Sequence, residues 1–179
     1  NIKSFNTLQE ALDEIQSNSD ISEIRVAVNH SEDGSNTITI NKENLMIDFW
    51  DEWDGSVASN HSAGSILNFK LANGIKAVEF GGSRDLNIKG NSENNYIIGN
   101  SGNNKIYGKG GDDILLGGKG DDIIYGGLGN DFADGMDGMD LVYGQRGDDT
   151  LVATGSFDLE SKDLLYGGYG DDILIDSAN

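Results

Sequence analysis

Residues 108–134 read GKGGDDILL, GGKGDDIIY and GGLGNDFAD, which are three copies of one nine-residue pattern placed end to end. The pattern extends in both directions, from Gly90 to Ile175, in nine windows with one insertion at 153–157. Self-similarity at a short fixed period indicates a solenoid, in which each repeat adds one structural unit. Position 6 is Asp or Asn and position 8 is apolar in every window: the columns are Asn95, Asn104, Asp113, Asp122, Asp131, Asp140, Asp149, Asp163 and Asp172, and Ile97, Ile106, Leu115, Ile124, Ala133, Val142, Leu151, Leu165 and Leu174.

The composition excludes several classes of function. The 179 residues include 31 acidic and 12 basic side chains, for a net charge of -19, and no cysteine. Without cysteine there is no disulfide framework and no thiolate metal site. An acidic chain repels phosphate, so the sequence predicts no nucleic-acid partner. No apolar run approaches the roughly 18 residues of a membrane span, so we expect no membrane insertion by this chain.

The repeats predict turns joined by a thin core. Glycine fills position 1 in eight windows and position 4 in seven, and it suits turns that need left-handed backbone or close approach to a ligand. Asn or Asp dominates position 5 and tolerates the left-handed region. One buried apolar side chain per window contributes roughly 1.5–3 kcal/mol. Ordering the window's backbone costs roughly 1–2 kcal/mol per residue, so another stabilising element is needed, and Ca²⁺ with oxygen ligands is the natural candidate.

The windows resemble the RTX family of calcium-binding nonapeptide repeats, whose pattern is GGxGxDxUx. The resemblance covers 90–175 and implies an all-β parallel β-roll, in which six residues of each repeat turn and the last three form a strand. Two repeats would make one coil, and Ca²⁺ would lie between a turn and the turn one coil further along. The implied ligands are position-6 carboxylates and turn backbone: Asp113, Asp122, Asp131, Asp140, Asp149, Asp163 and Asp172, with Gly108, Gly111, Gly117, Gly120, Gly126, Gly127, Gly129, Gly135, Gly138, Gly144, Gly147, Gly168 and Gly170.

Pairing each window with the next but one gives the number of expected calcium sites. Three sites follow from one column of aspartates and two from the other, which makes five full sites. Asn95 and Asn104 would raise the total to seven, although their amides lack a charge and should bind more weakly. The eighth window departs most from the pattern, because Asp158 and Ser161 stand where glycine is expected. The alternative is an acidic solenoid without metal, in which the stacked carboxylates would repel one another.

The first half, residues 1–89, predicts a helix followed by short strands. Residues 7–10, TLQE, form a capping box, and apolar side chains recur at helical spacing over residues 8–16. Alternating apolar segments then predict strands at 24–28, 38–40, 45–49, 67–71, 78–80 and 86–88. We therefore expect a parallel β-helix capped by an N-terminal α-helix and continuous with the repeats at 90–175. A small unrelated α+β domain is the alternative.

No arrangement of residues typical of catalysis stands out. His30 and His61 are the only histidines, and neither has a spacing typical of metal or nucleophile chemistry. Acidic residues lie beside two tryptophans in residues 48–54, a combination that a carbohydrate site uses, although such a run is more often an exposed loop. The sequence favours a protein without enzyme activity.

The favoured function is a calcium-binding module of a secreted bacterial protein, extracellular or on the cell surface. The resemblance implies type I secretion, with folding where calcium is abundant. The absence of proline removes slow isomerisation from folding. The alternative is part of a uronate lyase, an alginate epimerase or an adhesin, with a polysaccharide partner. Because the chain ends at Asn179, soon after the last repeat, we expect it to be a piece of a larger protein.

Overall fold

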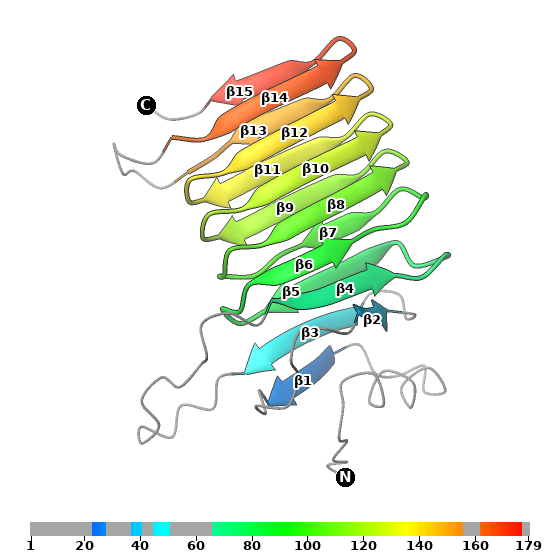
Figure 1. Cartoon of the computed structure of the whole chain (residues 1–179), viewed down its shortest axis with the longest axis vertical. Helices are drawn as coiled ribbons and strands as arrows, with labels where there is room; N and C mark the ends of the chain where they lie inside the picture. Colours follow the sequence, from blue (N-terminus) through cyan, green and yellow to red (C-terminus); the bar gives the residue numbers. More distant parts are fainter. Residues whose placement is uncertain (1–22, 28–36, 41–44, 51–65, 156–161, 177–179) are drawn as a thin grey trace.

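Successive strands alternate between two parallel sheets, which makes the chain a β-solenoid (Figure 1). The computed structural model describes residues 23–27, 37–40, 45–50, 66–155 and 162–176. One sheet contains β1 (Glu23–Ala27), β3 (Leu45–Trp50), β5 (Ala77–Gly81), β7 (Tyr96–Ile98), β9 (Ile114–Lys119), β11 (Phe132–Asp137), β13 (Thr150–Ala153) and β15 (Ile173–Asp176). The other contains β2 (Thr37–Ile40), β4 (Leu67–Leu71), β6 (Leu86–Lys89), β8 (Lys105–Gly110), β10 (Ile123–Leu128), β12 (Leu141–Arg146) and β14 (Leu164–Tyr169).

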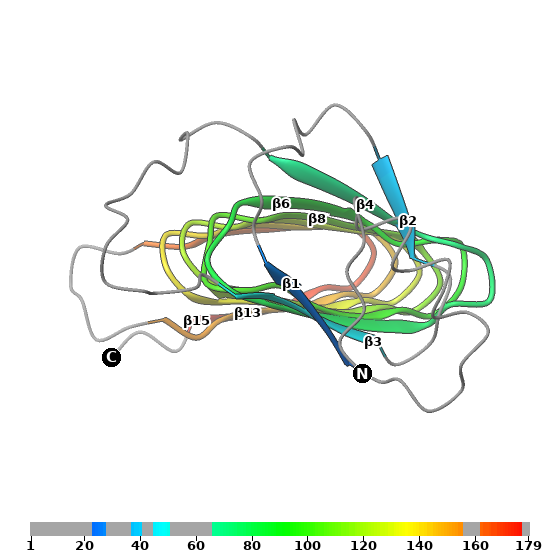
Figure 2. The ribbon, with the colours of Figure 1, turned by 90° about the horizontal axis from the view of Figure 1, so that it is seen from below.

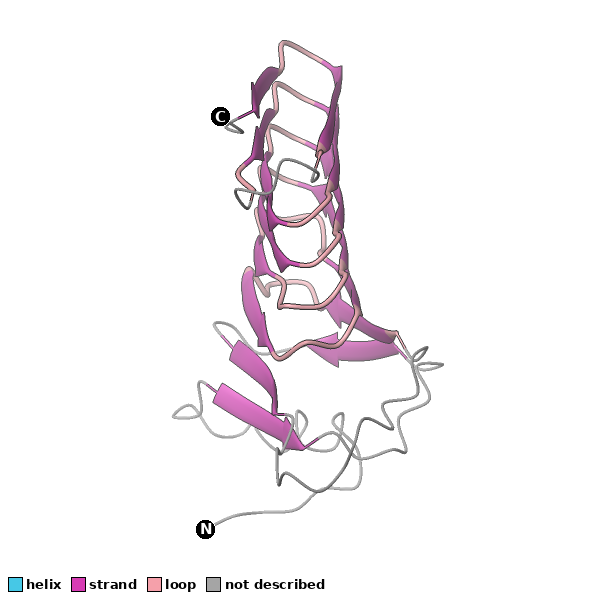
Figure 3. Cartoon of the chain, turned by 90° about the vertical axis from the view of Figure 1, so that its left-hand side faces the viewer, coloured by secondary structure: helices cyan, strands magenta, loops and turns pink. Residues whose placement is uncertain are grey.

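Two repeats make one coil, as predicted. Ile114 of β9 pairs with Phe132 of β11, and the other sheet keeps the same register. The insertion lengthens one coil without shifting this register, because Leu141 pairs with Leu164 across it. Figure 2 shows the coils lying almost one above another, and Figure 3 shows the two sheets facing each other.

The position-8 side chains fill the narrow space between the sheets. Ile97, Ile106, Leu115, Ile124, Ala133, Val142 and Leu151 are fully buried. Leu174, in the last described coil, is 50% exposed, because no described coil stacks on it. The coils of β4 to β6 carry a larger core that includes Phe69 and Phe80, whose ring centroids lie 4.7 Å apart. The calcium sites are therefore expected in the part of the solenoid whose apolar core is thinner.

The strands of the repeats are longer than the three residues that the resemblance implies. β8 to β12 and β14 each have six residues, covering positions 7–9 of one window and 1–3 of the next. Pairing continues past a bend at position 2, where Lys109, Met136 and Gln145 have φ values of 84°, 73° and 86°. The predicted strand was too short because the backbone bends there without leaving the ladder.

The first half is confirmed in its strands. β1 to β6 lie within two residues of the predicted segments. β6 pairs with β4 and with β8, so the ladder crosses residue 90 without a break. The expected helix at 8–16 lies outside the described residues, as do His30 and His61. The described residues contain no helix, and hence none that could cross a membrane.

Candidate metal centre

The position-6 aspartates form two columns inside the turns that precede the strands. Each places Oδ1 on the backbone N–H of the position-6 residue one coil earlier; Asp113, for example, donates to Asp131 Oδ1 at 2.8 Å. The same bond joins Asp131 to Asp149, Asp149 to Asp172, Asp122 to Asp140 and Asp140 to Asp163, at 2.8–3.0 Å. One carboxylate oxygen of each pair is thus fixed by the backbone of the neighbouring coil.

Among the described residues, the other carboxylate oxygen of five aspartates has no hydrogen-bond partner. These side chains are only 1–2% exposed. Buried polar atoms in folded proteins almost always have a partner, so a column of partnerless oxygens indicates missing donors or cations. The five atoms are Oδ2 of Asp113, Asp122, Asp131, Asp140 and Asp149.

A position-1 glycine opens the space beside each of these oxygens. A Cβ at Gly108 would collide with Asp113 Oδ2 and with the carbonyl oxygen of Gly126, one coil further along. Two oxygens therefore border one small space, and glycine keeps it open. Gly117, Gly126 and Gly144 repeat this arrangement, while at Gly135 the atoms nearest to a Cβ belong to Asp140.

Position-4 glycines bring the turns of neighbouring coils into close contact. Gly147 has a φ of 133°, and its Cβ would collide with the carbonyl oxygen of Gly129. Any other residue there would be strained and would separate the coils. The predicted glycines at position 4 form such stacks: Gly111, Gly120, Gly129, Gly138, Gly147 and Gly170.

Residues 81–115, 89–124, 98–133, 116–151, 125–160 and 157–175 each match the family described as RTX calcium-binding nonapeptide repeat (4 copies). Together the matches cover 81–175, more than half of the chain. The chain belongs to the RTX family. No curated protein and no solved structure matches it. Its RTX repeats form the β-roll of a calcium-binding family, as the resemblance implied.

The RTX turns have a second, exposed ladder that sequence reasoning missed. Position-5 side chains accept the N–H of the position-5 residue one coil further along, as from Asp112 to Asn94 at 3.0 Å and from Asn130 to Asp112 at 2.8 Å. None of the position-5 residues has the positive φ that the sequence suggested. Asp and Asn recur at position 5 because each supplies an acceptor oxygen to the next coil. The buried acidic column is the one at position 6.

Burial raises the pKa of the position-6 carboxyl groups. The pKa of Asp122 rises to about 8, mainly because of burial and further because of the neighbouring Asp140 charge, while backbone N–H donation from Asn104 opposes the rise. For the same main cause the pKa is about 7 for Asp131 and about 6 for Asp113 and Asp140. Burial also raises the pKa of Asp149 and Asp163. An ionised column is therefore costly unless a cation accompanies it.

Without calcium, acidification from pH 8 to pH 5 should stabilise the repeats. A carboxyl group with a raised pKa in the folded chain contributes stability when protonated, and that contribution is lost as the pH rises through the folded-state pKa. In chelator, the β signal of residues 90–175 in circular dichroism should therefore be larger at pH 5 than at pH 8, because protonation of these carboxyl groups favours the folded repeats. Asp122→Asn should shrink the difference more than Asp121→Asn, which removes the same charge at an exposed neighbour. A metal-stripped chain that is more stable at pH 8 would contradict this assignment.

The coil that contains the insertion has a different turn. Asp134, at position 9 and 9% exposed, accepts hydrogen bonds from the Thr154 hydroxyl at 2.7 and 2.8 Å and from the Met136 N–H at 3.0 Å. Asp163 still accepts the N–H of Asp140 at 2.8 Å. Residues 156–161 of this coil lie outside the described part of the chain.

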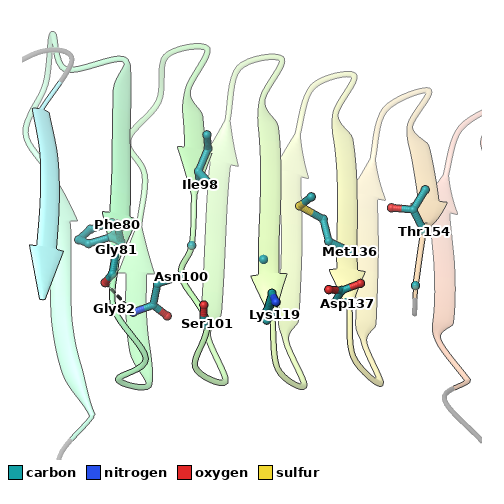
Figure 4. A pocket seen from close by; sticks show the side chains of 13 residues that line it. Phe80, Gly81, Gly82, Ile98, Asn100, Ser101, Lys119, Met136, Asp137 and Thr154 are labelled. Atoms are coloured by element: carbon teal, nitrogen blue, oxygen red, sulfur yellow. Dashed lines mark hydrogen bonds between the residues drawn. The ribbon is translucent and has the colours of Figure 1, made fainter. Parts of the chain in front are cut away.

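A shallow groove of about 510 Å³ crosses the coils beside the turns (Figure 4). Phe80, Ile98, Asn100, Met136 and Thr154 are among the residues that line it. Among the described residues, its ionisable lining side chains are Lys119 and Asp137.

Four tyrosines at position 9 stack along the outside of the solenoid. The ring centroids of Tyr107, Tyr125, Tyr143 and Tyr166 lie 5.0 Å apart, with planes within 14° of parallel. Such pairs contribute about 0.5–1.5 kcal/mol beyond the area that they bury. The two inner rings have both faces covered, so they offer no flat aromatic face to a sugar. The ladder joins coils, and the polysaccharide partner stays a prediction.

Proposed function

We propose that residues 90–175 bind Ca²⁺ in the turns between coils, and that the ions complete a fold that the thin core cannot stabilise alone. The five partnerless Oδ2 atoms are the observation that carries this proposal. Each atom belongs to the aspartate that comes first in the chain in one of the five predicted pairs, so their number agrees with five full sites. Each pair would share one ion, with turn carbonyl oxygens such as that of Gly126 completing its ligands.

The donor set fits calcium better than other metals. Carboxylate and carbonyl oxygens suit Ca²⁺, which accepts six to eight oxygen ligands in flexible geometry. Within the described part of the chain, no three His, Cys, Asp or Glu side chains gather at one point. Backbone oxygens must therefore supply much of the coordination, which disfavours zinc.

The charge balance supports the same number of ions. Residues 90–175 include 16 acidic and five basic side chains. Five Ca²⁺ ions would bring ten positive charges, close to the excess of acid, and would relieve most of the self-repulsion.

A module of this kind would respond to its surroundings. Where calcium is scarce the repeats would stay unfolded, and where calcium is abundant they would fold onto the coils of residues 1–89. We therefore propose a secreted protein, extracellular or on the cell surface, whose export in an unfolded state uses type I secretion. The support is the family and the absence of proline.

Equilibrium dialysis of the metal-stripped chain against Ca²⁺ tests the proposal directly. We expect about five bound ions, with half-saturation at roughly 10⁻⁴ to 10⁻³ M, as in other extracellular modules. Mg²⁺ should compete poorly, because it prefers a tight octahedral shell with retained water. No calcium bound at 10 mM would refute the proposal.

A further inference from the structure

The first two turns of the repeats in the chain contain asparagine at position 6, where the later turns contain aspartate. Different groups lie beside the position-1 glycine in these two turns. At Gly99 the atom nearest to the open space, apart from the carbonyl oxygen of Gly117, is Asn104 Nδ2. This nitrogen donates to the carbonyl oxygens of Gly102 at 2.8 Å and Gly117 at 3.4 Å. Asn104 Oδ1, which carries no charge, has no hydrogen-bond partner among the described residues. A donor thus stands where the later turns place a carboxylate oxygen.

In the turn at Gly90, other groups of the chain donate to the oxygens of the turn. Asn95 Oδ1 faces Gly90, but it already accepts the backbone N–H of Asn91 at 2.9 Å. The carbonyl oxygen of Gly90 accepts the Lys109 ammonium at 2.6 Å. A positive charge that belongs to the chain therefore lies in this turn.

Position 2 shows where this kind of closure stops. Asn91, Asn100 and Lys109 each donate to a carbonyl oxygen 19 residues earlier, those of Ala72, Gly81 and Gly90 (Figure 4 shows the second). In the next two windows the residue is Gly118 or Gly127, which has no side-chain donor. Position 2 therefore provides no side-chain donor in the two windows that follow Lys109.

We infer that the turns at Asn95 and Asn104 take no calcium, because amide and ammonium groups of the chain replace the ion there. A cation in the Asn104 turn would have to displace the amide nitrogen that already donates to the carbonyl oxygens of Gly102 and Gly117. Near Gly90 it would meet the Lys109 charge. The solenoid is then divided: coils up to β8 close without metal, and calcium begins at Asp113. This inference rests on the proposed function and limits the number of ions to five.

Native mass spectrometry of saturated protein tests the inference with a matched pair of variants. Asn104→Asp places a carboxylate opposite Gly117 and should add one bound ion. Asn103→Asp adds the same charge one residue away, on an exposed side chain that accepts the Asp121 N–H, and should add none. A wild-type chain that binds six or seven ions, or an Asn104→Asp variant that binds no more than wild type, would overturn the inference. A wild-type chain that binds none would instead refute the proposed function.

A second pair of measurements does not depend on how Asn104→Asp folds. The double variant Asn95→Asp/Lys109→Gly should also gain one ion, since it removes the ammonium and glycine suits the φ of 84° at position 109. In chelator, hydrogen exchange should show protection over β4 to β7 and rapid exchange over β11 to β13. Equal loss of protection in both regions, or no added ion in the double variant, would count against metal-free closure.

Discussion

Removal of calcium should unfold the repeats while the coils that precede them in the chain stay folded. Binding that is specific for the folded state stabilises it by about 2.7 kcal/mol per site at a hundredfold excess of ligand over its dissociation constant. Five such sites together match the whole stability of an ordinary domain, about 5–15 kcal/mol. In excess chelator we expect loss of most of the β signal of 90–175 in circular dichroism and a larger hydrodynamic radius. Added Ca²⁺ should restore both cooperatively, because each coil stacks on its neighbour.

The control for this result is Mg²⁺ at the same ionic strength. It screens the repulsion among the carboxylates equally but does not suit the turns, so it should restore little structure. Full recovery in Mg²⁺ would mean that screening alone, rather than bound calcium, holds the coils together. An unchanged spectrum in chelator would show that the core suffices without metal.

Much of this architecture follows from two columns of the sequence. The apolar residue at position 8 predicts the interior, and Ile97 to Leu151 are buried as expected. The acidic residue at position 6 predicts the turn interior, and Asp113 to Asp149 lie there. Both predictions are correct because, in a solenoid with a strict nine-residue period, the side chain at a given position occupies the same place in every coil. The predicted strands of the first half are found as well, since alternation of apolar residues marks one buried face.

Other features depend on contacts between coils, which a single window does not show. The bend at position 2 allows six-residue strands, although Lys109 and Met136 gave no sign of a positive φ. The role of Asn104 was predicted from its missing charge alone, yet the structure shows its amide donating to two carbonyl groups. The hydrogen bond from a position-2 side chain to the carbonyl oxygen 19 residues earlier can be recognised only once the register of the coils is known.

The largest effect of a single substitution is expected at a position-1 glycine. Gly108→Ala would drive a Cβ into Asp113 Oδ2 and the carbonyl oxygen of Gly126, the two oxygens that border the first proposed site. Overpacking alone costs about 1–3 kcal/mol, and loss of the ion adds to it. We expect the calcium concentration at half-folding to rise severalfold, because the cost is spread over the uptake of about five ions, and one fewer ion to bind.

Gly110→Ala, two residues away, provides the matched control. Its Cβ would find no atom closer than 3.8 Å, an ordinary contact, and its φ is not positive. Replacing such a glycine lowers the entropy of the unfolded chain and stabilises by about 0.4–1 kcal/mol. A calcium titration followed by circular dichroism should therefore separate the two variants clearly. Equal midpoints would mean that the space beside Gly108 is not where calcium binds. A raised midpoint together with one fewer bound ion, in Gly108→Ala alone, would place the ion between Asp113 and Gly126.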